Sequence, residues 1–276
     1  MRKVGTSLPL VGYSTIFMLN GYSLPMDKNT IDKYIPLDRF IKTIDSKELV
    51  FVSPEAWYDP FEQRFYGIDC YSRGYITEDI ACICFSEKSI RNEDACWRVY
   101  ANSGEKAVRV SFNYMILLQF LDEYAKSNGF RVFIGQANYS LEKKDIKELN
   151  NPHSTYYNEY FPDMMDRENY LSLMLLKRKS FEYENEIRFF LVREKIEFDK
   201  DNLLKIPCDY KAQKLISNVT LSPFPRIQEK DNKLIRAYRQ IYRTESEQMK
   251  KYINDKLGCR VQQSRLYEDC RRIESV

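Results

Sequence analysis

This 276-residue chain has very little histidine and lacks the glycine-rich loops that commonly bind nucleotides. His153 is the single histidine, which argues against a Ser-His or Cys-His catalytic centre and against a histidine metal cluster. Only 9 glycines are present. Neither G-x-G-x-x-G nor G-x-x-x-x-G-K-[ST] occurs, and there is no G-x-S-x-G elbow. The usual nucleotide loops and serine-hydrolase centres are therefore excluded.

Paired cysteine motifs and long apolar runs are also missing. The 7 cysteines are irregularly spaced and include no C-x-x-C pair, so we expect neither a disulfide nor a bound metal. Cys82 and Cys84 lie in an apolar run and have the setting of reduced thiols, which suits the cytosol. No apolar run is long enough to span a bilayer, and the N-terminus lacks a signal-peptide cleavage site. We expect a soluble cytoplasmic protein that does not contact membranes.

The composition is that of a globular protein with an excess of aromatic residues. Hydrophobic residues make up 43% and charged residues 30% of the chain, with 21 Tyr and 16 Phe. Tyrosine suits both cores and binding clefts. The net charge of +3 does not by itself indicate a nucleic-acid partner. Basic residues exceed acidic ones after Arg226, which is typical of a solvated helix face, with a weak polyanion contact as the alternative.

Apolar periodicity predicts many short strands with few helices between them, which favours an α+β fold over a doubly wound sheet. The predicted strands are a short one between residue 28 and the helix at 38–44, followed by residues 49–53, 80–85, 107–112, 131–135, 137–139, 186–192 and 218–222. The predicted helices are residues 38–44, 94–101, 115–124, 168–179 and 230–256. Residues 142–163 are polar and irregular and are expected to form a loop or short helices.

The strongest local feature is the segment 181–188, in which Glu182, Glu184 and Glu186 alternate and lead into an apolar strand. In an extended chain these three carboxylates point to one side. Like charges at this separation need cations nearby. The cations available in the sequence are Lys177, Arg178, Lys179 and Arg188. The segment is either a catalytic acid pair or a salt-bridged strand entry.

Two further segments combine aromatic and polar residues. Ser53 ends a predicted strand and precedes an acid-rich aromatic turn, in which Asp59 is expected to cap its own backbone. Trp97 and Tyr100 share one face of a predicted helix, where core packing is the simplest role.

Together these segments resemble a family of bacterial proteins of unknown function. The shared patterns are K-Y at Lys33-Tyr34, S-x(5)-DPFE from Ser53 to Glu62, CFS at Cys84-Phe85-Ser86, W-x-x-YA-x-x-x-G from Trp97 to Gly104, F-x-x-E-x-E-x-R from Phe181 to Arg188 and the closing strand at Val219. The resemblance covers about residues 30–225 of the chain, and residues 226–276 would be a helical extension of a single domain.

That family is similar in layout to ADP-ribosyltransferases, including the DarT-type enzymes that modify DNA. The resemblance implies an ADP-ribosyltransferase-like fold with two small sheets at an NAD cleft. It implies that Lys33 or Tyr34 contacts NAD and that Ser53 supports the site. Glu186 would stabilise the transition state, with Glu184 beside the acceptor. The remaining residues assigned to the NAD site are Phe85, Ser86, Trp97 and Tyr100, the last two as supports behind it.

The chemistry that the resemblance implies is NAD-dependent transfer of ADP-ribose to a macromolecule. A fixed carboxylate stabilises the oxocarbenium charge that develops as the nicotinamide bond breaks. A second carboxylate can accept the proton of the incoming nucleophile. Nucleic acid is favoured over protein as the acceptor. Such proteins are often bacterial toxins, with antitoxin partners, or phage-defence effectors.

Two alternatives remain open at this point. An NAD glycohydrolase on the same fold would share the first half of the reaction. A non-enzymatic binding module would no longer catalyse the reaction. This alternative stays open because Lys33 stands where the fold carries His or Arg.

Overall fold

The computed structural model describes residues 8–9, 12, 14–19, 22, 29–67, 78–87, 93–100, 106–141, 167–223 and 233–266. The chain forms two compact units, each assembled from three segments. Unit 1 comprises Met1–Asn29, Leu49–Glu87 and Met115–Ile206. Unit 2 comprises Thr30–Glu48, Lys88–Tyr114 and Pro207–Val276. Both combine helices with strands, so the predicted α+β class is confirmed.

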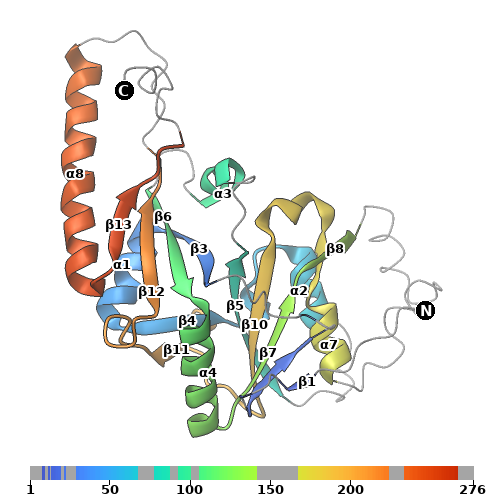
Figure 1. Cartoon of the computed structure of the whole chain (residues 1–276). Helices are drawn as coiled ribbons and strands as arrows, with labels where there is room; N and C mark the ends of the chain where they lie inside the picture. The colour runs from blue at the N-terminus through green and yellow to red at the C-terminus, as the bar shows by residue number, and fades with distance from the viewer. Residues whose placement is uncertain are drawn as a thin grey trace. The chain divides into compact units, whose positions relative to one another are not determined.

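Unit 1 contains a row of strands in the order β1-β2-β7-β10-β5 (Figure 1). Their bounds are Leu8–Pro9 for β1, Ile16–Met18 for β2, Arg131–Gln136 for β7, Glu186–Arg193 for β10 and Asp79–Ser86 for β5. β2 and β7 are parallel, and the other pairs in this row are antiparallel. β4 (Glu48–Val52) pairs with β5 and with β11 (Leu203–Pro207). A separate parallel pair joins β8 (Asn138–Leu141) to β9 (Leu176–Arg178).

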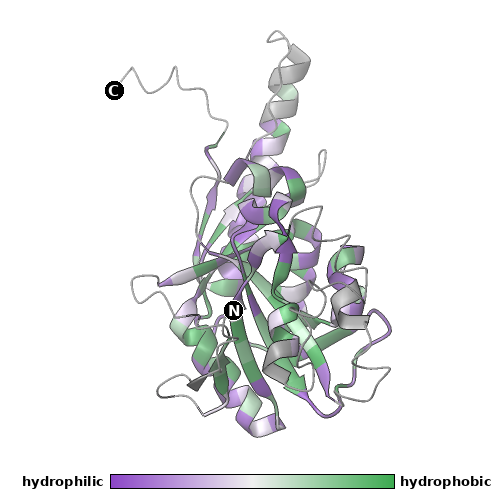
Figure 2. Cartoon of the chain, turned by 90° about the vertical axis from the view of Figure 1, so that its right-hand side faces the viewer, coloured by the Kyte–Doolittle hydropathy of each residue, from purple (hydrophilic) through white to green (hydrophobic). Residues whose placement is uncertain are grey.

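Strand β10 forms the centre of unit 1. It lies between β5 and β7, and each of its residues except Arg193 is buried. A strand that is covered on both faces needs apolar residues on both, and β10 supplies them at Ile187 and from Phe189 to Val192, with the buried Arg188 between them. The strands carry mostly hydrophobic residues (Figure 2). The core on one side of β10 contains Leu19, Ile80, Cys82, Phe133, Tyr170, Leu171, Met174, Leu175, Phe190 and Val192.

The helices of unit 1 are η1 (Pro54–Ala56), α2 (Pro60–Gly67), α4 (Tyr114–Asn128, all but its first residue), α7 (Arg167–Leu173) and η4 (Lys179–Glu184). Capping interactions mark the start of α2 and the end of α4 among them. The Phe61 N–H donates to Asp59 Oδ1 at 3.0 Å, so Asp59 caps α2 as predicted. Gly129 ends α4 with a φ of 69°, and the Phe130 N–H donates to the Ala125 carbonyl at 3.0 Å.

Unit 2 contains four strands in the order β3-β6-β12-β13. Their bounds are Thr30–Pro36 for β3, Ala107–Asn113 for β6, Ile216–Leu221 for β12 and Arg260–Gln263 for β13. The first two pairs are antiparallel, whereas β12 and β13 are parallel and are therefore joined by a crossover. The crossover contains α8 (Lys233–Leu257), which runs alongside β13 (Figure 1). The other helices are α1 (Leu37–Ser46) and α3 (Glu93–Tyr100).

Several predicted elements need correction. The helix predicted for residues 168–179 ends at Leu173, and Leu176–Arg178 instead form β9, which pairs with β8. Tertiary pairing therefore overrides the helical spacing of this segment. Strands β11 and β13 and helix α2 were not predicted. The predicted loop at residues 142–163 lies outside the described residues. In the part of the chain that is described, no helix is both long and apolar enough to cross a bilayer.

Gly135 on β7 provides a test of packing in unit 1. A Cβ at this position would collide with the Leu175 side chain and lie 3.2 Å from Leu19 Cβ. Because Leu19 and Leu175 are both fully buried, Gly135→Ala should destabilise the protein by about 1–3 kcal/mol. Gly129→Asn is the matched control, since that position faces open space and asparagine tolerates a positive φ. Urea denaturation of both variants measures the effect. Equal midpoints for Gly135→Ala and the wild type would refute this account of the packing.

Candidate functional site

Strand β10 places Glu186 and Arg188 on the same face, because side chains two residues apart point to the same side of a strand. Arg188 lies directly opposite Cys84 of β5 and Gly135 of β7. The guanidinium extends from this face of the sheet toward Glu62 and Trp57, whereas the space above Gly135 is filled by Leu175 and Leu19. The Arg188 side chain is only 1% exposed and the Glu186 side chain 8%.

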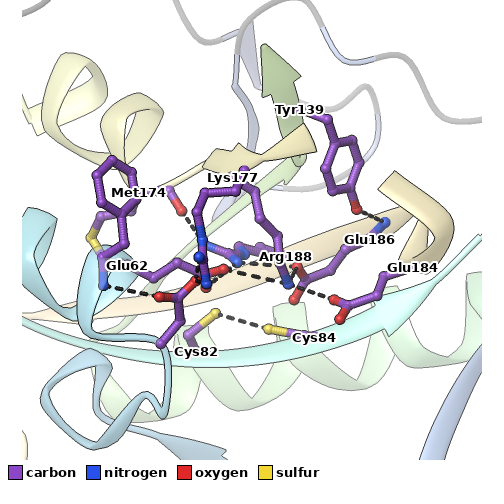
Figure 3. A network of polar contacts seen from close by, with 12 residues as sticks. Glu62, Cys82, Cys84, Tyr139, Met174, Lys177, Glu184, Glu186 and Arg188 are labelled. Atoms are coloured by element: carbon purple, nitrogen blue, oxygen red, sulfur yellow. Dashed lines mark hydrogen bonds and ion pairs between the residues drawn. The ribbon is translucent and has the colours of Figure 1, made fainter. Parts of the chain in front are cut away.

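Three carboxylates surround the ammonium group of Lys177 on β9 (Figure 3). Lys177 Nζ lies 2.5 Å from Glu184 Oε2, 2.8 Å from Glu186 Oε2 and 3.5 Å from Glu62 Oε1. Glu62 comes from the first turn of α2 and Glu184 from the end of η4. Residues far apart in the sequence of unit 1 therefore meet at one buried cation.

The Arg188 guanidinium links two of these carboxylates, those of Glu62 and Glu186. Its Nη2 atom lies 2.6 Å from Glu62 Oε2 and 3.1 Å from Glu186 Oε2. Its Nη1 atom donates to the Met174 carbonyl, and the indole ring of Trp57 covers it with a centroid distance of 4.5 Å. Buried charges are tolerated when they are paired and hydrogen-bonded, and Nη1 and Nη2 meet that condition, whereas Nε is buried without a hydrogen-bond partner among the described residues.

The segment that carries the three alternating glutamates is not extended throughout. Residues Lys179–Glu184 form the 3₁₀ helix η4, and only Glu186 lies in a strand. With three residues per turn, Glu182 and Glu184 face different directions, and Glu182 is exposed. Asn185 then takes a left-handed conformation with a φ of 42°, which turns the chain into β10. This turn lets Glu184 and Glu186 approach the same ammonium group.

The side chain of Asn185 is fixed by contacts on both sides. Its Oδ1 accepts from Gln136 Nε2 at 3.1 Å, and its Nδ2 donates to Glu87 Oε2 at 3.2 Å. The Glu87 N–H donates to the Asn185 carbonyl at 2.8 Å. These contacts compensate for the cost of a positive φ in a residue other than glycine.

The pKa values of Glu184 and Glu186 are shifted in opposite directions. Burial opposes ionisation of Glu186, but the charges of Arg188 and Lys177 outweigh burial and lower the pKa of Glu186 well below its usual range. Burial raises the pKa of Glu184, and the negative charge of Glu186 adds to the increase despite the opposing effect of Lys177. Although burial opposes its charge, the surrounding glutamates raise the pKa of Lys177, so it stays a cation. Two carboxylates with opposite shifts are a common arrangement for acid–base chemistry.

Tyr139 and two cysteines complete the surroundings. The hydroxyl of Tyr139 on β8 accepts a hydrogen bond from the Glu186 N–H at 2.7 Å, which holds the start of β10. Burial raises the pKa of Tyr139, so this hydroxyl stays protonated. Cys82 and Cys84 lie on the same face of β5 with their sulfur atoms 3.8 Å apart. The hydrogen bond to Cys82, together with burial, raises the pKa of Cys84 and keeps it a neutral thiol.

The remaining predicted site residues of unit 1 lie at different distances from this cluster. Ser86 is directly opposite Glu186 on β5, whereas Phe85 faces the other side of the sheet and packs against Phe189. Ser53 is buried, and its hydroxyl accepts the Glu55 N–H at 3.3 Å as the cap of η1. The structure thus brings Ser86 to the cluster and gives Ser53 a local structural contact.

The other predicted NAD-binding residues lie in unit 2. The Tyr34 ring contacts Trp97 edge-on at 5.0 Å and stacks on Tyr100 at 5.8 Å between centroids. Lys33, its neighbour on β3, points to the opposite face. Burial raises the pKa of Tyr34 although the charge of Arg109 opposes this. The predicted convergence of Tyr34 with Ser53 and Glu186 stays a prediction.

Two residues around the buried ammonium group, Glu62 and Tyr139, had no role in the sequence analysis. Glu62 is the last residue of the S-x(5)-DPFE pattern. Its position in the first turn of a helix after Asp59-Pro60 is the signal that could have marked it as a candidate site residue. Tyr139 carries no local signal, because its hydrogen bond to Glu186 spans 47 residues. Lys177 and Arg188 were anticipated as counter-cations, whereas Lys179 is exposed and Arg178 pairs with Asp59 at 2.9 Å.

The arrangement is therefore a buried cluster of Glu62, Glu184, Glu186, Lys177 and Arg188, named here the glutamate cluster. Within the described ranges, no group of three or more Cys, His, Asp or Glu side chains is placed to hold a metal ion. No family model, no curated protein and no solved structure matches this chain. The chemistry of the glutamate cluster thus has to be argued from its own geometry.

The opposite pKa shifts predict opposite pH dependences of stability for two variants. Glu186 has a lowered folded pKa, so its ionisation stabilises the fold above the unfolded value of about 4.3, and this stabilisation is lost as pH falls. Glu186→Gln should therefore be much less stable than the wild type near neutral pH and approach it in acid. Glu184 has a raised folded pKa, so its contribution is complete below about pH 4.3 and is lost as pH rises. Glu184→Gln should gain on the wild type as pH rises.

Thermal midpoints measured from about pH 3 to about pH 7 test these signs around the usual carboxyl pKa. Glu182→Gln is the control, since Glu182 neighbours the same residues in sequence but is exposed. Its stability should follow that of the wild type throughout. Parallel curves for Glu184→Gln and Glu186→Gln would contradict the assignment.

Proposed function

We propose that this protein is an NAD-dependent ADP-ribosyltransferase that modifies a macromolecule, with Glu186 and Glu184 as its catalytic residues. The observation that carries the proposal is the meeting of these two carboxylates at one ammonium group, with their pKa values shifted in opposite directions. The resemblance of the motifs to that class of enzymes supports it. Nucleic acid is favoured over protein as the acceptor.

The charge balance of the glutamate cluster suits this chemistry. With all groups ionised, Glu62, Glu184 and Glu186 carry three negative charges against the two positive charges of Lys177 and Arg188, which leaves one negative charge. In a buried setting this excess stabilises positive charge more strongly than it would in water. A transition state in which the ribose develops oxocarbenium character is therefore favoured over the ground state.

The proposed reaction assigns one step to each glutamate. The bond between C1′ of the ribose and the nicotinamide nitrogen breaks, and its electron pair goes to that nitrogen. Glu186 stabilises the ribose cation. The acceptor nucleophile forms the new bond to C1′, and its proton goes to Glu184, whose raised pKa makes it the better base of the two. The Glu184 side chain is 13% exposed, against 8% for Glu186, which fits contact with an incoming acceptor.

One observation favours a second candidate function. Glu186 is almost fully buried and already paired with two cations, as expected for a structural salt-bridge network in a binding module. The two candidates differ in the effect of removing its charge. A catalytic Glu186 controls turnover, whereas a structural one controls stability alone.

We predict that Glu186→Gln lowers NAD consumption by at least about a hundredfold while the protein stays folded. The substitution keeps the shape of the side chain and removes the charge that stabilises the ribose cation. The measurement is release of nicotinamide from NAD by the purified protein, alongside circular dichroism of each variant. Glu182→Gln should retain wild-type turnover. A folded Glu186→Gln variant with full turnover would remove Glu186 from the mechanism.

Glu184→Gln should impair transfer more than hydrolysis, because its proposed partner is the acceptor. Incubation with NAD labelled in the ADP-ribose part and cell lysate, followed by separate nuclease and protease digestion, measures transfer and identifies the acceptor class. Equal losses of transfer and hydrolysis would assign Glu184 to the first half of the reaction. Label that stays on protein after nuclease treatment would reject the nucleic-acid acceptor.

A further inference from the structure

Unit 2 contains a large polar groove that the proposed chemistry does not use. Its volume is about 1050 Å³, and it is lined by residues of β13 and the segment after it, by one face of α8 and by side chains from β6, β12 and α3. The parallel pairing of β13 with β12 forms its floor from residues that lie close to the end of the described chain. All of the lining residues belong to unit 2.

Positive charge dominates this groove. Its cationic residues are Arg109, Arg243, Lys250, Arg260 and Arg265, against the two acids Glu93 and Glu247, which leaves a net charge of +3. The whole chain also carries +3, spread over 43 basic and 40 acidic residues. The groove therefore has a local excess of positive charge that the nearly balanced composition of the whole chain does not reveal.

Two of these arginines are available to a ligand. Arg109 lies 3.2 Å from Glu93, and Lys250 lies 2.7 Å from Glu247, so both have intramolecular partners. Arg243 and Arg260 are exposed, and neither forms an ion pair with any residue in the described ranges. Arginine presents a planar set of donors that matches phosphate in two-point hydrogen bonds.

Neutral groups in the groove also suit a polar ligand. Thr220, Gln262, Gln263 and Ser264 line it, and the Gln263 Oε1 atom is buried without a hydrogen-bond partner in the structure. Apolar lining is limited to Val261 and Leu266, and no aromatic residue occurs among the described lining residues. An acidic peptide needs pockets for its side chains to bind specifically, and base stacking needs aromatic rings. Contact with a repeating phosphate backbone needs neither.

We propose that this groove binds the phosphodiester backbone of a nucleic acid, independently of base sequence. The guanidinium groups of Arg243 and Arg260 donate hydrogen bonds to phosphate oxygens of the backbone. Binding of this kind depends strongly on salt, because each neutralised phosphate releases condensed counterions. The proposal does not require NAD or the glutamate cluster.

The test uses the full chain and fluorescein-labelled 20-nucleotide RNA and DNA of mixed sequence, each single-stranded and as a duplex, without NAD. Anisotropy titrations at several salt concentrations give the dissociation constant and its salt slope. The double variant R243A/R260A should bind about tenfold or more weakly at low salt, with a slope smaller by about two. Both side chains are exposed, so the variant should keep the wild-type thermal midpoint.

The matched control is K42A/K251A, which removes the same charge from exposed positions of unit 2 outside the groove. It should bind as the wild type does, and the absence of NAD from the titrations separates groove binding from the proposed catalysis. The four probes show which form of nucleic acid the groove prefers. The proposal is overturned if no probe binds the wild type, if K42A/K251A loses as much affinity as R243A/R260A, or if poly-glutamate binds the groove more tightly than every nucleic acid.

Discussion

The buried guanidinium group of Arg188, on one face of β10, is the charge on which the surrounding structure depends. Arg188 is 1% exposed, and a buried charge of this kind destabilises a fold by several kcal/mol unless partners neutralise it. Glu62 and Glu186 supply the opposite charge, the Met174 carbonyl accepts a hydrogen bond, and the Trp57 ring covers the group. Helix α2, the turn before β9 and strand β10 are thus linked through one side chain.

The same requirement explains why Lys177 is present. Arg188 alone would leave the carboxylates of Glu62, Glu184 and Glu186 with an excess of negative charge in a buried setting. The ammonium group contacts all three, and its own charge is stabilised in return. The net result is one remaining negative charge whose position is shared between carboxylates of opposite pKa shift. The same five residues therefore neutralise one another's buried charges and form the site of the proposed chemistry.

Elements with strong periodicity were predictable from the sequence, whereas the geometry of the glutamate cluster was not. Strand β10 and helices α1 and α8 follow from continuous or regularly spaced apolar residues. The approach of Glu184 to Glu186 depends on the left-handed turn at Asn185, which is held by Gln136 and Glu87 from distant parts of the chain. Local patterns cannot encode such contacts. The basic residues after position 226 were interpreted as a solvated helix face, and Arg243 is indeed exposed on α8, but the groove that Arg243 and Lys250 line together with β13 could not be foreseen from the sequence.

The position of β13 in the sequence has a consequence for the order in which unit 2 is completed. Its parallel partner β12 ends at Leu221, and α8 must be synthesised before Arg260–Gln263 can pair with it. During translation at about 5–20 residues per second, the ribosome therefore exposes the edge of β12 for several seconds before β13 emerges to cover it. Until then the floor of the groove does not exist, while every residue of unit 1 has already been made. The basic groove therefore forms only after all of unit 1 has been synthesised.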